Sequence, residues 1–392
     1  MGYTGGVKIA LVSGSAGDTR CGVGDYAFEL AQHLALDAEV TLYHAAGHGP
    51  AQPPYERLTT LELREVSGFS AITIGFLARS IAKEGYDIVH LQYPSKGYGS
   101  SVGPGFLPQR LAGMHSRSRV VVTLHEWCTS HPLRKMVMDQ MLPSADLLIV
   151  TNEQELEGLV KRSGGKRTEV IPVGNVLASR RELDNVWRKH EGKELRKPEP
   201  PSGPGGRKPF ALFHYGLPAK GKGLGRLLEA VKLVRDSGLD ARLDLAGEFK
   251  PGTPLTDELL EQITRYELVE AVTKLGHLDR EEVAAAAEKC CLGVFPFEEG
   301  YSSKRSSIAG LTQLDLPLVV GAGSREEHPF WAPEENTAAS LAVLLVELFS
   351  GRLESEWAGQ VERQREYGER FSFSQIARQH LRAYQELDKD DR

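Results

Sequence analysis

The sequence predicts an α/β protein with two doubly wound domains in tandem, and three features support this prediction. Short apolar strands alternate with stretches whose apolar residues recur at helical spacing, as in parallel sheets covered by helices on both faces. The alternation occurs twice, and a segment rich in proline and glycine, residues 198–206, separates the two series. With 392 residues, the chain is too long for one ordinary core and long enough for two domains.

The first series begins with a nearly all-apolar strand at residues 7–13, as expected for a strand that is covered on both faces. A glycine-rich loop follows, and the residues on one face of the next helix are Val23, Tyr26, Ala27, Leu30, Ala31 and Leu34. Further strands are expected at residues 39–43, 88–91, 120–124 and 147–150.

The second series starts with a strand at residues 210–214 and a helix at residues 224–234. Its further strands are expected at residues 243–246, 272–275, 292–295 and 318–320, and a last helix at 376–384 packs on one of the domains. We therefore expect a first domain over residues 1–190, a linker over 191–208, a second domain over 209–368 and a terminal helix within 369–392. Ligands should bind beyond the carboxyl ends of the strands, in a cleft.

Composition excludes several classes of protein. Apolar residues make up 41% and charged residues 26%, which is typical of a globular protein, and the net charge of -6 argues against a dedicated nucleic-acid binder. The four cysteines form no C-x-x-C pair, so we expect reduced thiols and a cytoplasmic protein. No apolar run approaches the length of a membrane span, although basic clusters near residues 161–167 and 180–197 leave peripheral membrane contact open.

A glycine loop opens the first helix of the first domain. Gly22, Gly24 and Ala27 match the spacing of a dinucleotide-binding fingerprint, in which backbone N–H groups meet an anion. The loop after the first strand is long, however, and the second strand ends in Tyr43 and His44 rather than in an acid. A dehydrogenase is therefore the weakest of the enzyme hypotheses.

His125 follows the expected strand at residues 120–124, where it should face the cleft. A histidine in this place can equally well hydrogen-bond a loop. His90 lies inside a strand and is expected to be structural, whereas Gln92 and Tyr93 lie at the end of that strand and could line an acceptor pocket.

Two loops of the second domain carry residues that suit a phosphate ligand. Lys222 lies among glycines at the start of a helix, where an ammonium group and backbone N–H groups act together on a diphosphate, although a solubilising turn is the alternative. Beyond the strand at residues 292–295, Glu298 and Glu299 precede a run of hydroxyls and cations. The alternative for this loop is a helix cap with surface charges.

Together these loops resemble the retaining glycosyltransferases of the GT-B fold, family 4, and the resemblance covers most of the chain. Residues 216–223 look like the G-R-x-x-x-x-K-G stretch of that family, and residues 275–278 resemble its base-contacting loop. Residues 296–307 resemble its E-x7-E segment, and residues 171–175 the run that closes its first domain.

The resemblance implies two Rossmann-like doubly wound domains that face each other across a cleft, with the last helix packed back on the first domain. The donor would be a nucleotide diphosphate sugar, a UDP-sugar by expectation, bound mostly by the second domain, and no other cofactor is expected. His125 and Glu299 would be the catalytic residues. The resemblance further implies a diphosphate site of Gly24, Gly216, Lys222, Lys304, Arg305, Ser306 and Ser307, a base site of Gly276, His277 and Leu278, and an acceptor and sugar site of Gln92, Tyr93, Gly300 and Tyr301.

The sequence departs from the family pattern at two positions. Leu217 replaces the arginine beside the first glycine, and Ser307 replaces the second glutamate. We interpret Lys304 or Arg305 as the source of the missing positive charge, and an inactive relative is the alternative.

The resulting hypothesis is a retaining hexosyltransferase that acts on a saccharide, lipid-linked or small-molecule acceptor. Because no Asp-x-Asp pair lies at a strand end, we expect no metal ion in the reaction. The alternatives are an epimerase or phosphorylase on the same architecture and a non-catalytic protein that binds a sugar nucleotide.

Overall fold

The computed structural model describes residues 6–18, 21–114, 116–190, 205–303 and 305–387. The chain divides into two compact units. The first unit consists of Met1–Glu194 and Arg370–Arg392, and the second unit of Leu195–Glu369. Most of the expected linker, residues 191–204, lies outside the described residues.

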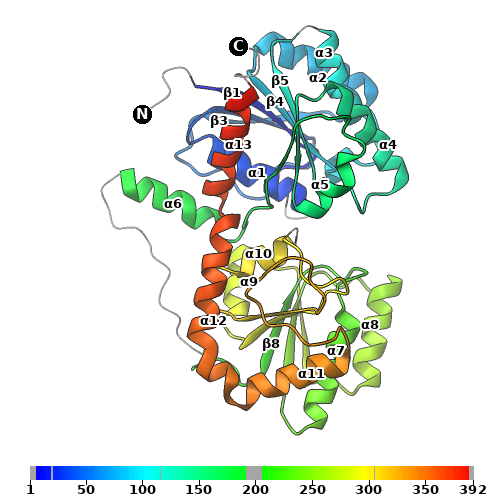
Figure 1. Ribbon diagram of the computed structural model, residues 1–392, viewed down its shortest axis with the longest axis vertical. Helices are drawn as coiled ribbons and strands as arrows, with labels where there is room; N and C mark the ends of the chain where they lie inside the picture. The colour runs from blue at the N-terminus through cyan, green and yellow to red at the C-terminus, as the bar shows by residue number, and fades with distance from the viewer. Residues whose placement is uncertain (1–5, 19–20, 115, 191–204, 304, 388–392) are drawn as a thin grey trace. The chain divides into compact units, whose positions relative to one another are not determined.

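In the described part of the first unit, seven parallel strands form one sheet in the order β3-β2-β1-β4-β5-β6-β7 (Figure 1). The strands are β1 (Lys8–Val12), β2 (Glu39–Ala45), β3 (Leu61–Val66), β4 (Ile88–Tyr93), β5 (Arg119–Leu124), β6 (Leu147–Val150) and β7 (Thr168–Val170). Five of them correspond to strands that the sequence predicts, and the order is that of a doubly wound sheet.

Helices cover both faces of this sheet because successive residues of its central strands point to opposite sides. Ala10 and Val12 of β1 belong to the core beneath α2 (Ala71–Glu84), α3 (Leu107–Gly113) and α4 (Pro132–Met141). Ile9 and Leu11 belong to the opposite core, which includes residues of α1 (Gly22–Leu34), α6 (Ser179–His190) and α13 (Phe373–Leu387). The remaining helices of the unit are α5 (Glu153–Val160) and the short turns Lys96–Tyr98, Gly103–Phe106 and Leu142–Ser144.

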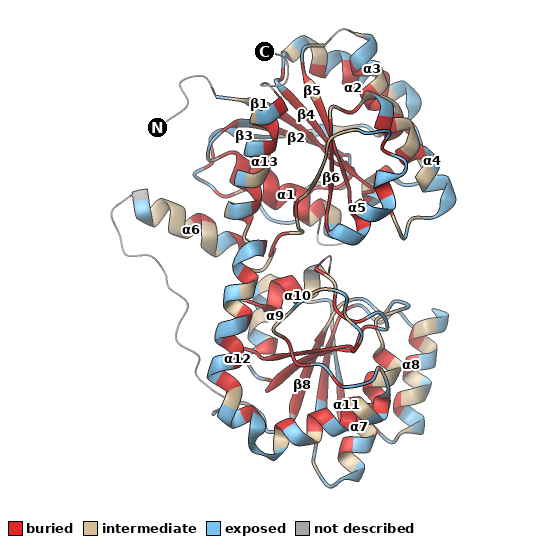
Figure 2. Ribbon diagram, in the orientation of Figure 1, coloured by how far each residue is buried: buried red, intermediate tan, exposed pale blue. Residues whose placement is uncertain are grey.

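The second unit has a parallel sheet in the order β10-β9-β8-β11-β12. Its strands are β8 (Ala211–Tyr215), β9 (Arg242–Ala246), β10 (Val272–Gly276), β11 (Leu292–Phe295) and β12 (Leu318–Val320). Its helices are α7 (Leu224–Asp236), α8 (Pro254–Arg265), α9 (Arg280–Ala287), α10 (Ser306–Leu311), α11 (Ala338–Glu347) and α12 (Leu353–Gly368). Figure 2 shows that the strands of both sheets are largely buried, which explains their nearly continuous apolar sequences.

The sequence did not predict β3 and β7, which are the two edge strands of the first sheet. Each pairs with one neighbour and is half-exposed, and β3 contains Glu62, Arg64 and Glu65. Edge strands are commonly charged because they face solvent, so they lack the apolar signal by which buried strands are recognised.

The terminal helix α13 packs on α1 within the first unit. Phe373 is fully buried, and its ring lies 5.7 Å from that of Tyr26 and 5.4 Å from that of His33. A side chain at Gly174 would collide with the Phe373 ring, since an added Cβ would come within 2.4 Å of it. Among the helices that the structure describes, none is long and apolar enough to span a bilayer.

Replacing Phe373 by alanine should destabilise the first unit by about 3–5 kcal/mol, because a fully buried aromatic ring leaves a cavity between α1 and α13. Urea unfolding, with hydrogen exchange to assign the transition to the first unit, measures this change. Phe76→Ala is the matched control, because Phe76 is mostly exposed on α2. Equal losses in the two variants would contradict the packing role of Phe373.

Candidate functional site

Two loops of the second unit lie side by side because the strands that precede them are neighbours. β8 pairs with β11, and their loops leave the same edge of the sheet. The backbone N–H of Glu298 donates to the carbonyl of Gly221 over 3.0 Å. Gly223 has φ +69° and lies so close to the carbonyl of Pro296 that an added Cβ would be 1.8 Å from its oxygen. Glycine at 223 therefore allows the two loops to meet.

Two cations from these loops flank one aromatic ring. Lys222 Nζ lies 5.1 Å and Arg305 Cζ lies 4.5 Å from the centre of the fully buried Phe297 ring. Among the described residues neither cation forms an ion pair, and Arg305 Nε is buried without a hydrogen-bond partner. Ser307 Oγ is likewise buried without a partner. The loops thus hold positive charge and hydrogen-bonding groups that no described residue satisfies.

The charge state of Lys222 reflects this environment. Burial and the positive charge of Arg305 together lower the pKa of Lys222 to about 8. Burial also lowers the pKa of Arg305, and the charge of Glu299 partly opposes that effect. A bound anion would relieve both the repulsion and the loss of solvation, so these loops are suited to an anionic ligand.

Hydrogen bonds from two polar side chains hold the backbone of the loop after β11, which contains Phe297. Arg226 of α7 donates to the carbonyl of Pro296 over 3.2 Å and to the side-chain oxygen of Asn336. The amide nitrogen of Asn336 donates to the carbonyls of Phe297, at 3.1 Å, and Glu298, at 2.5 Å. These roles leave no signal in the sequence, because Arg226 and Asn336 lie far from the loop along the chain and match no short motif.

The other predicted residues of this loop have different environments. Glu299 is exposed, and Gly300 has φ +73° at a place where an added Cβ would meet the backbone of Ser324 at 2.5 Å. Tyr301 is buried in an aromatic cluster with His328, Phe330 and Tyr367, and its hydroxyl accepts from Tyr367. The side chain of Tyr301 thus belongs to the core of this unit, and its contact with the sugar stays a prediction.

Two predicted phosphate ligands are only partly described. Lys304 lies outside the described residues, and Ser306 is described only as the first residue of α10.

The remaining predicted residues of the second unit lie at strand ends. Gly216 has φ +147°, and an added Cβ would lie 3.5 Å from Lys222 Nζ, so glycine keeps space beside the ammonium group. Gly276 ends β10 with φ +74°, His277 is exposed and Leu278 is half-buried. The last three are thus available to a ligand.

In the first unit, His125 is the end of a buried hydrogen-bond chain. His125 Nε2 lies 2.8 Å from Gln92 Oε1, Gln92 Nε2 lies 2.9 Å from His90 Nε2, and His90 Nδ1 lies 2.6 Å from the hydroxyl of Tyr384. Because an amide oxygen only accepts, His125 must donate from Nε2, which leaves Nδ1 as its acceptor. These hydrogen bonds therefore connect Tyr384 of α13 with His125 and fix which nitrogen of His125 carries the proton.

Burial keeps His125 neutral. Burial, with a smaller contribution from His380, lowers the pKa of His125 to about 3. Its ring also meets the ring of Tyr26 edge to face, at 5.1 Å. His125 is thus a fixed, uncharged imidazole with one unused lone pair rather than a proton donor at neutral pH.

Three predicted ligands of the first unit have structural environments instead. Gln92 is fully buried, with both ends of its amide engaged by histidines, and Tyr93 is buried against Tyr98 with ring centres 5.8 Å apart. Gly24 packs against Ser15, whose side chain would lie 2.6 Å from an added Cβ. In the structure these three residues pack against neighbouring groups of the first unit, and their contacts with an acceptor or a phosphate stay predictions.

No metal-binding cluster of three or more histidine, cysteine or acidic side chains occurs among the described residues.

A family model and several solved structures resemble this chain. Residues 21–175 match the model described as Glycosyltransferase Family 4, whereas no curated protein matches the sequence. The sucrose-phosphate synthase of Thermosynechococcus elongatus is similar to the chain with a TM-score of 0.70 and 19% identity, over 98% of this chain and 100% of that one.

Two further structures are similar over nearly their whole length. Anabaena HepE, solved with UDP and glucose, has a TM-score of 0.66 and 15% identity over 97% of this chain and 100% of that one. The trehalose 6-phosphate synthase of Burkholderia multivorans has a TM-score of 0.67 and 12% identity over 98% of each chain. The solved structures confirm the predicted GT-B fold, and the family model confirms the prediction of a glycosyltransferase.

Acid should destabilise the first unit through its buried histidines. Burial lowers the pKa of His125 to about 3 and of His380 to about 4, and also lowers the pKa values of His33 and His90. The unfolded chain binds protons below pH 6.5 and the folded unit does not. His125 and His380 therefore each cost about 1.4 kcal/mol of stability per pH unit as pH falls from about 6.5 towards 4, and His33 and His90 act in the same direction.

Urea unfolding at a series of pH values tests this expectation. His380→Gln should make the loss of stability with falling pH shallower by about 1.4 kcal/mol per pH unit. His131→Gln is the control, because His131 is exposed. If the stabilities of the two variants depend on pH in the same way, the buried histidines are not the cause of the acid sensitivity.

Proposed function

We propose that this glycosyltransferase of the GT-B fold is a retaining hexosyltransferase whose donor is a UDP-sugar. The observation that carries the proposal is that Lys222 and Arg305 flank the Phe297 ring and form no ion pair with any residue that the structure describes. A nucleoside diphosphate is the leaving group in such transfers, and its charge matches that of the pair. Anabaena HepE, whose structure contains UDP and glucose, supports the choice of base and sugar.

Departure of the nucleoside diphosphate builds negative charge on phosphate oxygens. Lys222 and Arg305 are already held in position, so they stabilise this charge without reorganisation during the reaction. Gly216 leaves room for a phosphate beside Lys222, and Ser307 Oγ offers a further hydrogen bond. Because these groups supply the compensating charge, the proposed reaction needs no metal ion.

Arg305 supplies the cation that Leu217 lacks. Leu217 is 56% exposed, whereas Arg305 lies beside Lys222 on the same aromatic ring. The charge of the arginine in the family pattern is thereby restored from the second loop. This arrangement favours an active transferase over the non-catalytic alternative.

His125 has a positioning role in the proposed mechanism. Its Nδ1 lone pair accepts a hydrogen bond from a substrate hydroxyl, and the Gln92 amide keeps that lone pair available. Glu299 is exposed and accepts from sugar hydroxyls. The acceptor hydroxyl attacks on the face that the leaving group vacates and passes its proton to the departing phosphate, so configuration is retained and no separate base is required.

The acceptor is a saccharide, lipid-linked or small-molecule hydroxyl, and the base contacts belong to Gly276, His277 and Leu278. An epimerase or phosphorylase differs from a transferase in its products. Incubation of the protein with UDP-sugars, with and without acceptors, separates these activities, because only a transferase releases UDP in proportion to a new glycoside.

Arg305→Ala and Lys222→Ala should each weaken UDP binding by about tenfold or more, since a hydrogen bond to a charged group contributes about 1.5–3 kcal/mol. Titration calorimetry with UDP measures the loss. Arg265→Ala is the control within the same unit, because Arg265 is exposed on α8. Unchanged affinity in both site variants would refute the proposed diphosphate site.

UDP affinity should also fall as pH rises through about 8, because the ammonium form of Lys222 binds the diphosphate and its pKa lies near that value. In Lys222→Arg the affinity should be nearly constant from pH 7 to about 9, since a guanidinium stays charged there. A wild-type affinity that does not change over this range would exclude Lys222 as a ligand.

Gln92→Leu should lower kcat by about tenfold or more while UDP affinity is unchanged, because His125 loses the partner that fixes its tautomer. Nitrogen NMR of the histidine rings should show His125 as a mixture of tautomers in this variant. Gln140→Leu, outside the hydrogen-bond chain, is the control. A parallel loss of UDP binding would point instead to general misfolding.

A further inference from the structure

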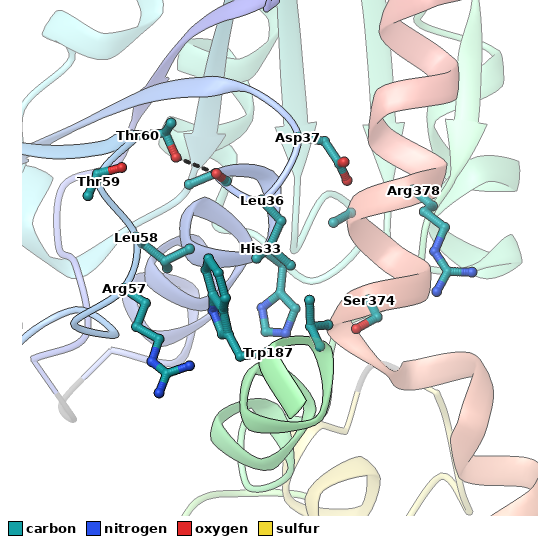
Figure 3. Close-up of a pocket in the computed structure, with 13 residues that line it drawn as sticks. His33, Leu36, Asp37, Arg57, Leu58, Thr59, Thr60, Trp187, Ser374 and Arg378 are labelled. Atoms are coloured by element: carbon teal, nitrogen blue, oxygen red, sulfur yellow. Dashed lines mark hydrogen bonds between the residues drawn. The ribbon is translucent and has the colours of Figure 1, made fainter. Parts of the chain in front are cut away.

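A second pocket lies in the first unit, and none of the residues discussed above as substrate ligands lines it. It has a volume of about 310 Å³ and is formed by the end of α1, the segment 57–60 before β3, and helices α6 and α13 (Figure 3). Its size suits one sugar ring with a substituent.

One wall of the pocket is His33, which has an unsatisfied acceptor. His33 Nδ1 lies 3.0 Å from the carbonyl of Glu29, so the ring proton is on Nδ1 and donates to that oxygen. Burial lowers the pKa of His33, which keeps the ring neutral. Nε2 is therefore a lone-pair acceptor, and in the described structure it is buried without a hydrogen-bond partner.

The carboxylate of Glu182 does not satisfy this nitrogen. Glu182 Oε2 lies 3.7 Å from His33 Nε2, but a carboxylate is also an acceptor. Glu182 already accepts from the backbone N–H groups of Phe373 and Ser374 at the start of α13. A ligand hydroxyl could donate to His33 Nε2, which no neighbouring group does.

A neighbouring wall of the pocket provides an aromatic surface. Trp187 of α6 is half-buried, and the Arg57 guanidinium lies 5.8 Å from the centre of its ring. Figure 3 shows the side chains of Trp187 and His33 next to each other, with Ser374 of α13 nearby. A flat apolar ring beside hydrogen-bonding groups matches a sugar, whose C–H face is apolar and whose edge carries hydroxyls.

The rim of the pocket is positively charged. Arg57 and Arg378 line it together with Asp37, all three are exposed, and the carboxylate of Glu182 lies deeper, beside His33. Thr59 and Ser374 add hydroxyl groups. Guanidinium groups bind phosphate and carboxylate oxygens in pairs, so the rim favours a sugar with an anionic substituent.

We propose that this pocket binds an anionic saccharide, apart from the donor site of the second unit. The sugar ring lies on Trp187, one hydroxyl donates to His33 Nε2, and the phosphate or carboxylate lies at Arg57. A ligand held in this way contacts α1, α6 and α13 together. Binding therefore stabilises the first unit and does not depend on UDP.

Tryptophan fluorescence can test the proposal without any assay of activity. Of the four tryptophans, Trp127, Trp331 and Trp357 are buried, and Trp187 is half-exposed in the pocket. Titration with glucose 6-phosphate should change the emission in a saturable way, with a Kd of about 1 mM or lower. The change should disappear in Trp187→Phe, and glucose alone should bind about tenfold more weakly because it lacks the anion.

Arg57→Gln and His33→Gln should each weaken binding by about tenfold. Arg79→Gln is the matched control, because Arg79 lies over the ring of Phe76 on α2, an arginine–aromatic pair outside the pocket. Arg57 is on the surface, so its variant keeps the test valid if His33→Gln fails to fold.

Three results would overturn the proposal. They are no saturable change with glucose 6-phosphate, equal binding in Arg57→Gln and Arg79→Gln, and an equal response to inorganic phosphate alone. Lys222→Ala should bind glucose 6-phosphate normally while it binds UDP weakly, so failure of this pocket and failure of the donor site are distinguishable.

Discussion

Parallel pairing of β8 with β11 is the constraint on which the candidate donor site depends. The pairing brings the ends of two strands, far apart in sequence, to the same edge of one sheet. Gly223 then allows the loops to touch, and Arg226 and Asn336 hold the second loop in place. The result is that Lys222 and Arg305 share the ring of Phe297 although like charges repel. Protein packing supplies the energy that keeps this anion site formed without an anion.

In the first unit, the orientation of His125 likewise depends on residues from distant parts of the chain. His125 follows β5, Gln92 and His90 belong to β4, and Tyr384 belongs to α13 near the end of the chain. These groups form one buried hydrogen-bond chain because α13 packs against α1 through Phe373. A buried series of hydrogen bonds is stable only if each polar group in it has a partner. The packing of α13 and the orientation of His125 are therefore coupled.

Most of the fold could be predicted from the sequence because buried parallel strands are nearly continuous apolar runs. The edge strands β3 and β7 were missed, since half-exposed strands carry charged residues and lack that signal. For the candidate site, the chemistry of their loops indicated Lys222 and Arg305, and the structure places both cations beside one ring. Gln92 and Tyr93 were assigned to an acceptor pocket because they lie at a strand end, and Tyr301 was assigned to the sugar by the resemblance, whereas all three side chains are buried in the structure.

The sequence by itself determined the two doubly wound sheets, the loops that follow their strands and the types of charge in those loops. These properties are local, since the spacing of apolar residues and the positions of glycines are set by neighbouring positions in the chain. The tertiary structure decided which polar side chains, among the residues described, are left without a partner. Lys222, Arg305 and His33 differ from other cations and histidines only in what packs against them, and those neighbours come from distant parts of the chain.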